Sequence, residues 1–272
     1  MDDALRLAVE GPVATLTIDR PERRNAFNLA MWQAIPDVVA MVEEAPAVRV
    51  LLIRGAGDGP FSAGADIAEF ATIRQPGDAA RHYSAAVHAA ERSLATLSKP
   101  TIALVQGWCV GGGCELALAC DLRVADEAAM FGITPSKLGI VYNQSSTARV
   151  VEIVGAAWAR YLLLTGDLID AAQALRIGLV HEVHPPAGAA TAAAALAGRL
   201  AERAPISLVG AKQLIARAAA GTAAEDAWAH RWYAAAAASR EYAEGVAAFT
   251  AKRAPDFTGI GWPARAEDDA PD

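Results

Sequence analysis

Residues 101–121 of the chain read TIALVQGWCVGGGCELALACD and form the most informative segment of the sequence. The first five residues, TIALV, are β-branched or apolar and predict a buried strand. Three glycines follow at 111–113, and the helix-forming run ELALA at 115–119 predicts a helix that begins beside them. Glycines let backbone N–H groups approach a ligand closely, and at a helix start those groups are unpaired and lie at the positive end of the dipole. The pattern predicts an anion-binding turn with the carboxylate of Glu115 beside it.

Three other interpretations of this segment can be compared with that prediction. The segment is long enough for a membrane span, but Gln106, Glu115 and the glycine triplet argue against one. A dinucleotide-binding fingerprint requires glycine where Leu116 stands. The remaining alternative is a tight turn between a core strand and a core helix, with Glu115 as a solvated acid in the first turn.

A second glycine-containing segment lies upstream, FSAGADIAEF at 61–70. Together with GWCVGGGCELALACDLRVA at 107–125, it resembles the crotonase (enoyl-CoA hydratase/isomerase) superfamily. Weaker similarities occur in the order that the family has them, at DRPERRNAF (19–27), LLTGDLIDAAQALRIGLVHEV (163–183) and EGVAAFTAKRAPDFTG (244–259). The resemblance covers nearly the whole chain, but it does not fix the reaction.

Composition limits the classes of protein to which the chain can belong. A chain of 272 residues with 54% apolar residues can bury one large core together with a helical appendage. A formal net charge of −7 provides no basic surface for nucleic acid. The three cysteines, at 109, 114 and 120, match neither a disulfide framework nor a zinc pattern and suit a reducing cytoplasm. The N-terminal residues MDDALRLAVEG lack a targeting signal, so we expect a cytoplasmic protein with no membrane partner.

Hydrophobic patterns predict short strands that alternate with helices along most of the chain. Residues 5–10 and 13–18 predict a hairpin around Gly11-Pro12, and the region 71–82, which has no clear periodicity, predicts a mobile loop. The further strands are expected at 48–54, 101–105, 122–125 and 179–183, with a loop of strand character at 129–139. The helices are expected at 29–42, 83–97, 147–154, 157–164, 169–176, 189–203, 206–220 and 223–249, and the acidic tail AEDDAPD at 266–272 is expected to be disordered.

The fold class predicted from this order is α/β followed by α, with a boundary near residue 190. The resemblance implies that residues 1–190 form a crotonase-like spiral of ββα units. It also implies that residues 191–272 form a helical C-terminal region that packs between subunits, as a homotrimer or a hexamer built from two trimers.

The resemblance further implies an active site for acyl-CoA thioesters. The N–H groups of Ala65 and Gly112 would surround the thioester oxygen, where negative charge develops during proton removal, hydration or decarboxylation. Fixed donors of this kind are worth about 3–4 kcal/mol each. Glu115 would act as acid and base. Further substrate- and CoA-binding residues are expected at Arg24, Ala26, Ala63, Gly64, Asp66, Ile67, Thr134 and Lys252; no metal is expected, and coenzyme A enters as part of the substrate, not as a cofactor.

The second half of this site departs from the family pattern. Hydratases of the family use two carboxylates on one water, and the position of the second is Pro135, which can neither accept nor donate a proton. The segment FGITPSKLGIVYN at 131–143 is similar to methylmalonyl-CoA decarboxylases, in which Thr134 and Tyr142 would hold a substrate carboxylate, although those enzymes carry histidine at the position of Ala65. Hydratase/isomerase chemistry with Glu115 as acid/base is the leading hypothesis. Decarboxylation, isomerisation by one base and acyl-CoA binding without turnover are the alternatives.

Overall fold

The computed structural model describes residues 4–73 and 77–263, and the chain divides into two compact units, Met1–Ala197 and Gly198–Asp272. The tail predicted to be disordered lies outside the described residues. The boundary predicted near residue 190 lies within helix α7 (Pro186–Ala201). The candidate site belongs entirely to the first unit.

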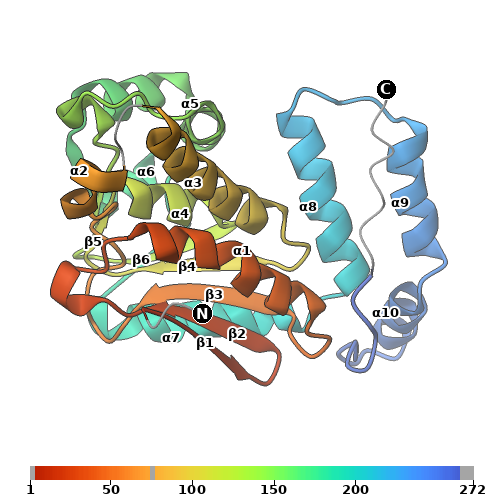
Figure 1. Cartoon of the computed structure of the whole chain (residues 1–272). Coiled ribbons are helices and arrows are strands. Elements are labelled where there is room, and N and C mark those ends of the chain that lie inside the picture. Colours follow the sequence, from red (N-terminus) through yellow and green to blue (C-terminus); the bar gives the residue numbers. More distant parts are fainter. Residues whose placement is uncertain (1–3, 74–76, 264–272) are drawn as a thin grey trace. The chain divides into compact units, whose positions relative to one another are not determined.

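A six-stranded sheet forms the centre of the first unit (Figure 1). Its strands, in spatial order, are β1 (Leu5–Glu10), β2 (Val13–Ile18), β3 (Val50–Gly55), β4 (Thr101–Val105), β6 (Leu122–Asp126) and β9 (Glu182–His184). The β1–β2 hairpin is antiparallel and every other pair is parallel, with Leu51 opposite Thr101 and Ile102 opposite Leu122. All five residues of β4 are buried, as the apolar run TIALV predicts for a central parallel strand.

A smaller sheet has the order β5 (Trp108–Val110), β7 (Met130–Gly132) and β8 (Leu168–Asp170). The prediction of a helix from residue 169 was wrong for its first two residues. Ile169 pairs with Phe131 in the sheet, and Asp170 caps the following helix α6 (Ala171–Arg176) by accepting a 2.7 Å hydrogen bond from the Gln173 amide. β5 leads directly into the glycine-rich turn, and the Gly111 amide donates a 2.8 Å hydrogen bond to the carbonyl of Gly132 in β7.

Helices α1 (Leu29–Glu44), α3 (Asp78–Thr96), α4 (Gly112–Ala119) and α5 (Gln144–Thr165) pack in succession. The loop predicted for 71–82 was wrong for most of its length, because the short helix α2 covers Phe70–Ile73 and α3 begins at Asp78. The first turn of α3 exposes Arg81 and His82, so it carries little apolar periodicity. The two helices predicted at 147–154 and 157–164 are the two parts of α5, which breaks at Gly155 with φ of 72°.

The second unit contains helices α8 (Pro205–Ala219), α9 (Ala227–Ala237) and α10 (Arg240–Thr250), and α8 and α9 share a small core of Ile206, Val209 and Trp232. The single helix predicted at 223–249 was wrong, because Asp226 and Ser239 cap two separate helices there. No helix among the described residues has the length and apolar character that a membrane crossing requires.

Candidate active site

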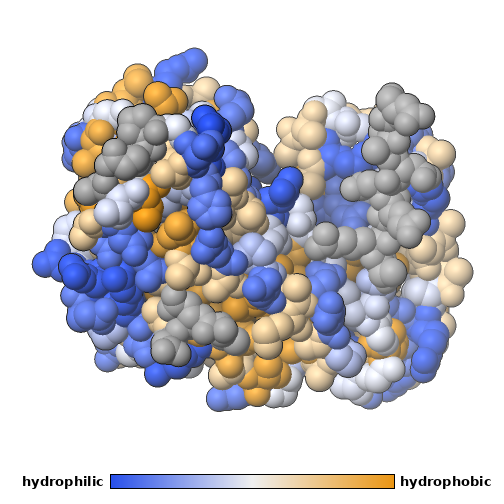
Figure 2. All heavy atoms as spheres, in the orientation of Figure 1, coloured by the Kyte–Doolittle hydropathy of each residue, from blue (hydrophilic) through white to orange (hydrophobic). Residues whose placement is uncertain are grey.

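A cavity of about 140 Å³ opens in the first unit, lined by four segments that are far apart in the sequence. They are the turn around Gly64 with the residues after it, one face of α3, the start of α4, and the segment from Thr134 to Asn143. The lining is mostly apolar with a few polar groups, which is typical of a ligand site. Side chains at the mouth are exposed, including Ile67 at 54% and Val141 at 93%, and hydrophobic surface is visible near α2 in Figure 2.

The turn at Ser62–Asp66 is held between two neighbouring segments. Ser62 forms a parallel bridge with Cys109, and Ala65 forms one with Phe27. Gly64 has a φ of +100°, and a Cβ there would lie 2.7 Å from the Val110 carbonyl oxygen. Only glycine fits both the conformation and the space, so this position brings the turn against the end of β5.

The glycine triplet forms the opposite wall. Gly111 has a φ of +53° and precedes α4, so Gly112 is the first residue of the helix. A Cβ on Gly112 would lie 2.9 Å from Cζ2 of Trp32 and 3.5 Å from the backbone nitrogen of Ala65. The two turns are therefore in direct contact, and the glycine leaves open the space between them.

Two backbone N–H groups, those of Ala65 and Gly112, lie at this contact. Neither donates a hydrogen bond to another residue of the described chain. The second is one of the unpaired amides that every helix start leaves, and it lies at the positive end of the α4 dipole. Such a pair of fixed donors beside a cavity can stabilise negative charge on an oxygen atom.

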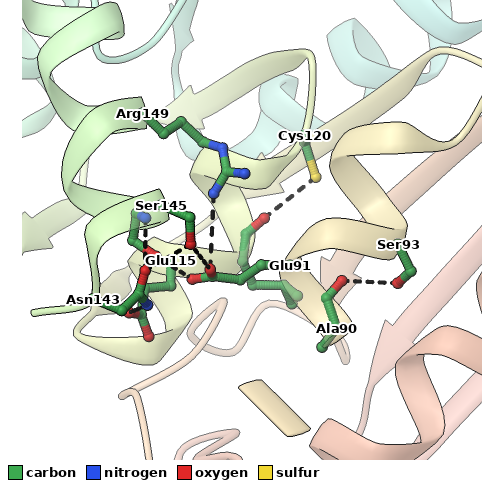
Figure 3. Close-up of polar contacts among 10 residues, drawn as sticks. Ala90, Glu91, Ser93, Glu115, Cys120, Asn143, Ser145 and Arg149 are labelled. Carbon is green, nitrogen blue, oxygen red and sulfur yellow. Dashed lines mark hydrogen bonds and ion pairs between the residues drawn. The ribbon is translucent and has the colours of Figure 1, made fainter. Parts of the chain in front are cut away.

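Glu115 lies one turn into α4 and lines the cavity. Its Oε1 accepts a 3.1 Å hydrogen bond from Nδ2 of Asn143, the N-cap residue of α5 (Figure 3). Among the described residues that line the cavity, Glu115 is the only carboxylate. Pro135 also lines it, as the first residue of a 3-10 turn, so the position at which the resemblance implies a second acid contributes a pyrrolidine ring.

The hydroxyl of Tyr142 is a further polar group at the cavity that has no hydrogen-bond partner among the described residues. Its oxygen atom is buried. Burial, and then the charge of Glu115, raise the pKa of Tyr142 well above its usual range, so the phenol stays protonated and can donate to a ligand. Thr134 lines the same part of the cavity.

The remaining predicted residues fall into two groups. Ala63, Gly64 and Ile67 line the cavity. Asp66 does not, because it caps a 3-10 turn and pairs with Arg20 at 2.8 Å. Burial opposes the charge of Asp66, but hydrogen bonds from Arg20 and the Ala68 amide outweigh it and lower the pKa.

The other three predicted residues lie outside the cavity. The carbonyl of Arg24 accepts a 3.0 Å hydrogen bond from the Ala63 amide, which fixes this left-handed residue beside the Gly64 turn. Ala26 is buried, and its carbonyl accepts a hydrogen bond from Arg20. Lys252 is an exposed residue of the second unit.

Several lining residues were not predicted from the sequence. Asn143 was not predicted as a site residue, although an Asn before a helical run is a helix-start signal. Ser84, Val87 and His88 share the cavity face of α3, at the i, i+3 and i+4 spacing of one helix face. Trp32 does not line the cavity, but it is fully buried beside Gly112, and only the folded chain reveals this contact.

Comparisons with known proteins identify the family of the chain. Residues 8–260 match the family model for enoyl-CoA hydratase/isomerase. The crotonyl-CoA hydratase of Syntrophomonas wolfei is 40% identical over 194 residues, which cover 71% of this chain and 74% of that protein. Two crystal structures superpose with a TM-score of 0.91: an enoyl-CoA hydratase/isomerase family protein from Hyphomonas neptunium (38% identity, 94% of this chain and 97% of that one) and an enoyl-CoA hydratase/carnithine racemase from Magnetospirillum magneticum (35%, 95% and 96%). The chain belongs to the enoyl-CoA hydratase/isomerase family, the crotonase superfamily, and has its α/β spiral fold.

Proposed function

We propose that this enzyme hydrates a 2-enoyl-CoA thioester, with the amides of Ala65 and Gly112 holding the thioester oxygen and Glu115 moving the proton. One observation carries the proposal: two uncommitted N–H groups face one cavity, and the carboxylate of Glu115 lines that cavity from the same helix as Gly112. Charge that develops on the oxygen meets preorganised donors, and the side chains remain available for proton transfer.

A single carboxylate can complete the reaction if it acts twice. Glu115 accepts a proton from water while the water oxygen bonds to Cβ, and the π electrons move onto the thioester oxygen as an enolate. The protonated Glu115 then returns its proton to Cα, and the carbonyl re-forms. Water is added across the double bond with no net change at the enzyme, so Pro135 does not prevent turnover. The Asn143 hydrogen bond supports this scheme because it orients the carboxylate.

Decarboxylation of a 2-carboxyacyl-CoA is the second candidate, and the unpartnered hydroxyl of Tyr142 favours it. This phenol and Thr134 could hold the substrate carboxylate while CO₂ leaves and the same enolate forms. Against it, a carboxylate beside Tyr142 would also meet the charge of Glu115, which, after burial, helps to raise the pKa of the phenol. Like charges in a partly buried site repel, so we rank decarboxylation below hydration.

The wider assignment follows from the same scheme. The amides hold the enolate charge, so the reaction needs neither a metal nor a cofactor beyond the coenzyme A of the substrate. We infer that Arg24 and Ala26 line the path of the coenzyme A moiety, because their loop is hydrogen-bonded to Ala63 at the cavity. We also propose that the protein works in the cytoplasm.

We also infer assembly into a homotrimer or a hexamer. Helix α10 exposes three large apolar side chains along one face, Tyr242, Val246 and Phe249, the last of them 87% exposed. An apolar face of this kind is typical of an association surface. Light scattering on the purified full chain measures the mass; a monomer at working concentration would refute the assembly.

The reaction is tested with three substrates: crotonyl-CoA, a 3-enoyl-CoA and methylmalonyl-CoA. Water addition, double-bond migration and CO₂ release are followed separately. We expect water addition to crotonyl-CoA, and we expect Glu115→Gln to lower kcat by about 10²–10⁴, the range of general acid–base catalysis, with acyl-CoA binding retained.

Two controls make the result specific. Glu43, like Glu115, is a carboxylate that accepts hydrogen bonds, in its case from the backbone amide and the hydroxyl of Ser98. Glu43 does not line the cavity, so Glu43→Gln is the control. Glu43→Gln should keep full activity. Tyr142→Phe should leave hydration largely intact.

Two other outcomes would change the assignment. CO₂ release that depends on Tyr142 would assign decarboxylation in place of hydration. Acyl-CoA binding without turnover of any substrate would identify a non-catalytic relative.

A further inference from the structure

The carboxyl group of Glu91 is buried near Glu115 but does not line the cavity. Glu91 is on α3 and its side chain is 1% exposed. Its Oε1 accepts a 2.5 Å hydrogen bond from the hydroxyl of Ser146, and its Oε2 lies 4.0 Å from the guanidinium of Arg149. Both partners belong to the first part of α5, the helix that Asn143 caps, and Figure 3 shows Glu91 between Arg149 and the Asn143 end of that helix.

Ser146 connects the two carboxyl groups. Its hydroxyl donates to Glu91, and its backbone amide donates a 2.7 Å hydrogen bond to Oδ1 of Asn143. The Ser145 hydroxyl also donates to that oxygen, at 2.8 Å, and lies 3.5 Å from Oε2 of Glu91. With Oδ1 held by two donors, the other end of the Asn143 amide must present Nδ2, which donates to Glu115.

We propose that Glu91 is a positioning residue, which acts through Ser146 and Asn143 to fix the orientation of the Glu115 carboxylate. The inference rests on the role proposed for Glu115. It explains why a carboxyl group is buried between two helices, where an apolar side chain would cost less. It also explains how a site with Pro135 in place of an acid keeps its single carboxylate oriented.

The charged and titratable groups around Glu91 allow a readout that a packing role alone would not give. His88 faces it from α3, Arg149 from α5 and Tyr142 from the residues just before α5, while Glu115 on α4 is reached through the Asn143 amide. Burial raises the pKa of Glu91, although hydrogen bonds and the cations nearby oppose the rise. Removing this carboxyl group changes the charge near Glu115, so it should change the pH dependence of turnover as well as its rate.

The experiment compares Glu91→Gln with wild type and with Glu43→Gln, which changes a hydrogen-bonded carboxylate on α1 that does not line the cavity. For Glu91→Gln we expect kcat to fall about tenfold, as for loss of one hydrogen bond to a charged group, with KM little changed. The acid limb of the kcat profile should move to lower pH, because the remaining carboxylate ionises more easily without a like charge nearby. Ser146→Ala, a smaller change, should reproduce the fall in kcat if Glu91→Gln folds poorly.

The inference is overturned if Glu91→Gln keeps the wild-type rate, or if its acid limb does not move, or if Glu43→Gln loses as much activity. A parallel titration separates this result from failure of the proposed reaction. Bound acetoacetyl-CoA forms its enolate without turnover, and near-ultraviolet absorbance follows the pH at which it does so. A wild type that hydrates nothing refutes the proposed function, whereas an enolate titration that is the same in wild type and Glu91→Gln refutes the positioning role.

Discussion

Substituting Gly112 by alanine tests the space between the two glycine turns. The added methyl group would lie 2.9 Å from Cζ2 of Trp32 and 3.5 Å from the nitrogen of Ala65. It would therefore lie within van der Waals distance of the Ala65 nitrogen, and we expect it to crowd the space where the thioester oxygen is proposed to bind. Trp32 cannot move far, because it is fully buried and packs against Phe27 with ring centroids 4.5 Å apart.

The expected loss follows from these contacts. Loss of one of the two hydrogen bonds to the thioester oxygen destabilises the transition state by about 2.7–4 kcal/mol, which lowers kcat by about 10²–10³. Crowding of Trp32 should also lower the free energy of unfolding by about 1–3 kcal/mol. Initial rates with crotonyl-CoA, corrected for the folded fraction from circular dichroism, measure the first effect, and denaturant unfolding measures the second.

The matched control for this variant is Gly210→Ala in α8. Its methyl group would lie 3.3 Å from Trp232, so it also crowds a tryptophan, but Gly210 does not line the cavity. We expect wild-type kcat for the control. A folded Gly112→Ala enzyme with wild-type kcat would refute the assignment of the oxygen site.

Three further predictions concern stability. Gly64→Ala should lower the free energy of unfolding by about 1–3 kcal/mol, measured by urea denaturation, because φ is +100° and the methyl group meets the Val110 carbonyl at 2.7 Å; an unchanged midpoint would contradict this. The raised pKa of Glu91 means that wild type loses stability as this carboxyl group ionises, whereas Glu91→Gln does not. The Tm of Glu91→Gln minus that of wild type should therefore become more positive as pH rises from about 4.5 to 7. A Tm difference that does not change with pH would be evidence against this. Hydrogen bonds from Arg253 and the Asp256 amide lower the pKa of Glu244 to about 2, so the stabilisation is present at neutral pH and is lost as pH falls from about 4.5 towards 2. Glu244→Gln should reduce the acid sensitivity of Tm, and high salt should reduce it in wild type because the pair is exposed.

Local patterns predicted the parts of this fold that local interactions determine. The apolar run at 101–105 forms a buried central strand, and the glycine triplet precedes a helix, because burial and backbone freedom can be recognised from neighbouring residues. Strands β5 and β8 are three residues long and exist through pairing with β7, so no local pattern marked them. The helical start of α3 was missed because its first turn is exposed and carries no apolar stripe.

The candidate site also has features that the sequence indicated and features that it did not. The sequence indicated Glu115, the two turns and the proline at the second acid position, because these are motifs with fixed spacing. It did not indicate that Asn143 would bind Glu115 across 28 residues, or that Ser146 would bind Glu91 across 55. Such contacts depend on how α3, α4 and α5 pack, which periodicity alone cannot determine.

The most direct test of the account is the crystal structure of the enzyme with bound acetoacetyl-CoA. We expect the thioester oxygen at about 2.7–3.1 Å from the backbone nitrogens of both Ala65 and Gly112, with the Glu115 carboxylate facing the acyl carbons. A thioester oxygen bound elsewhere in the cavity, or in contact with only one of the two amides, would contradict it.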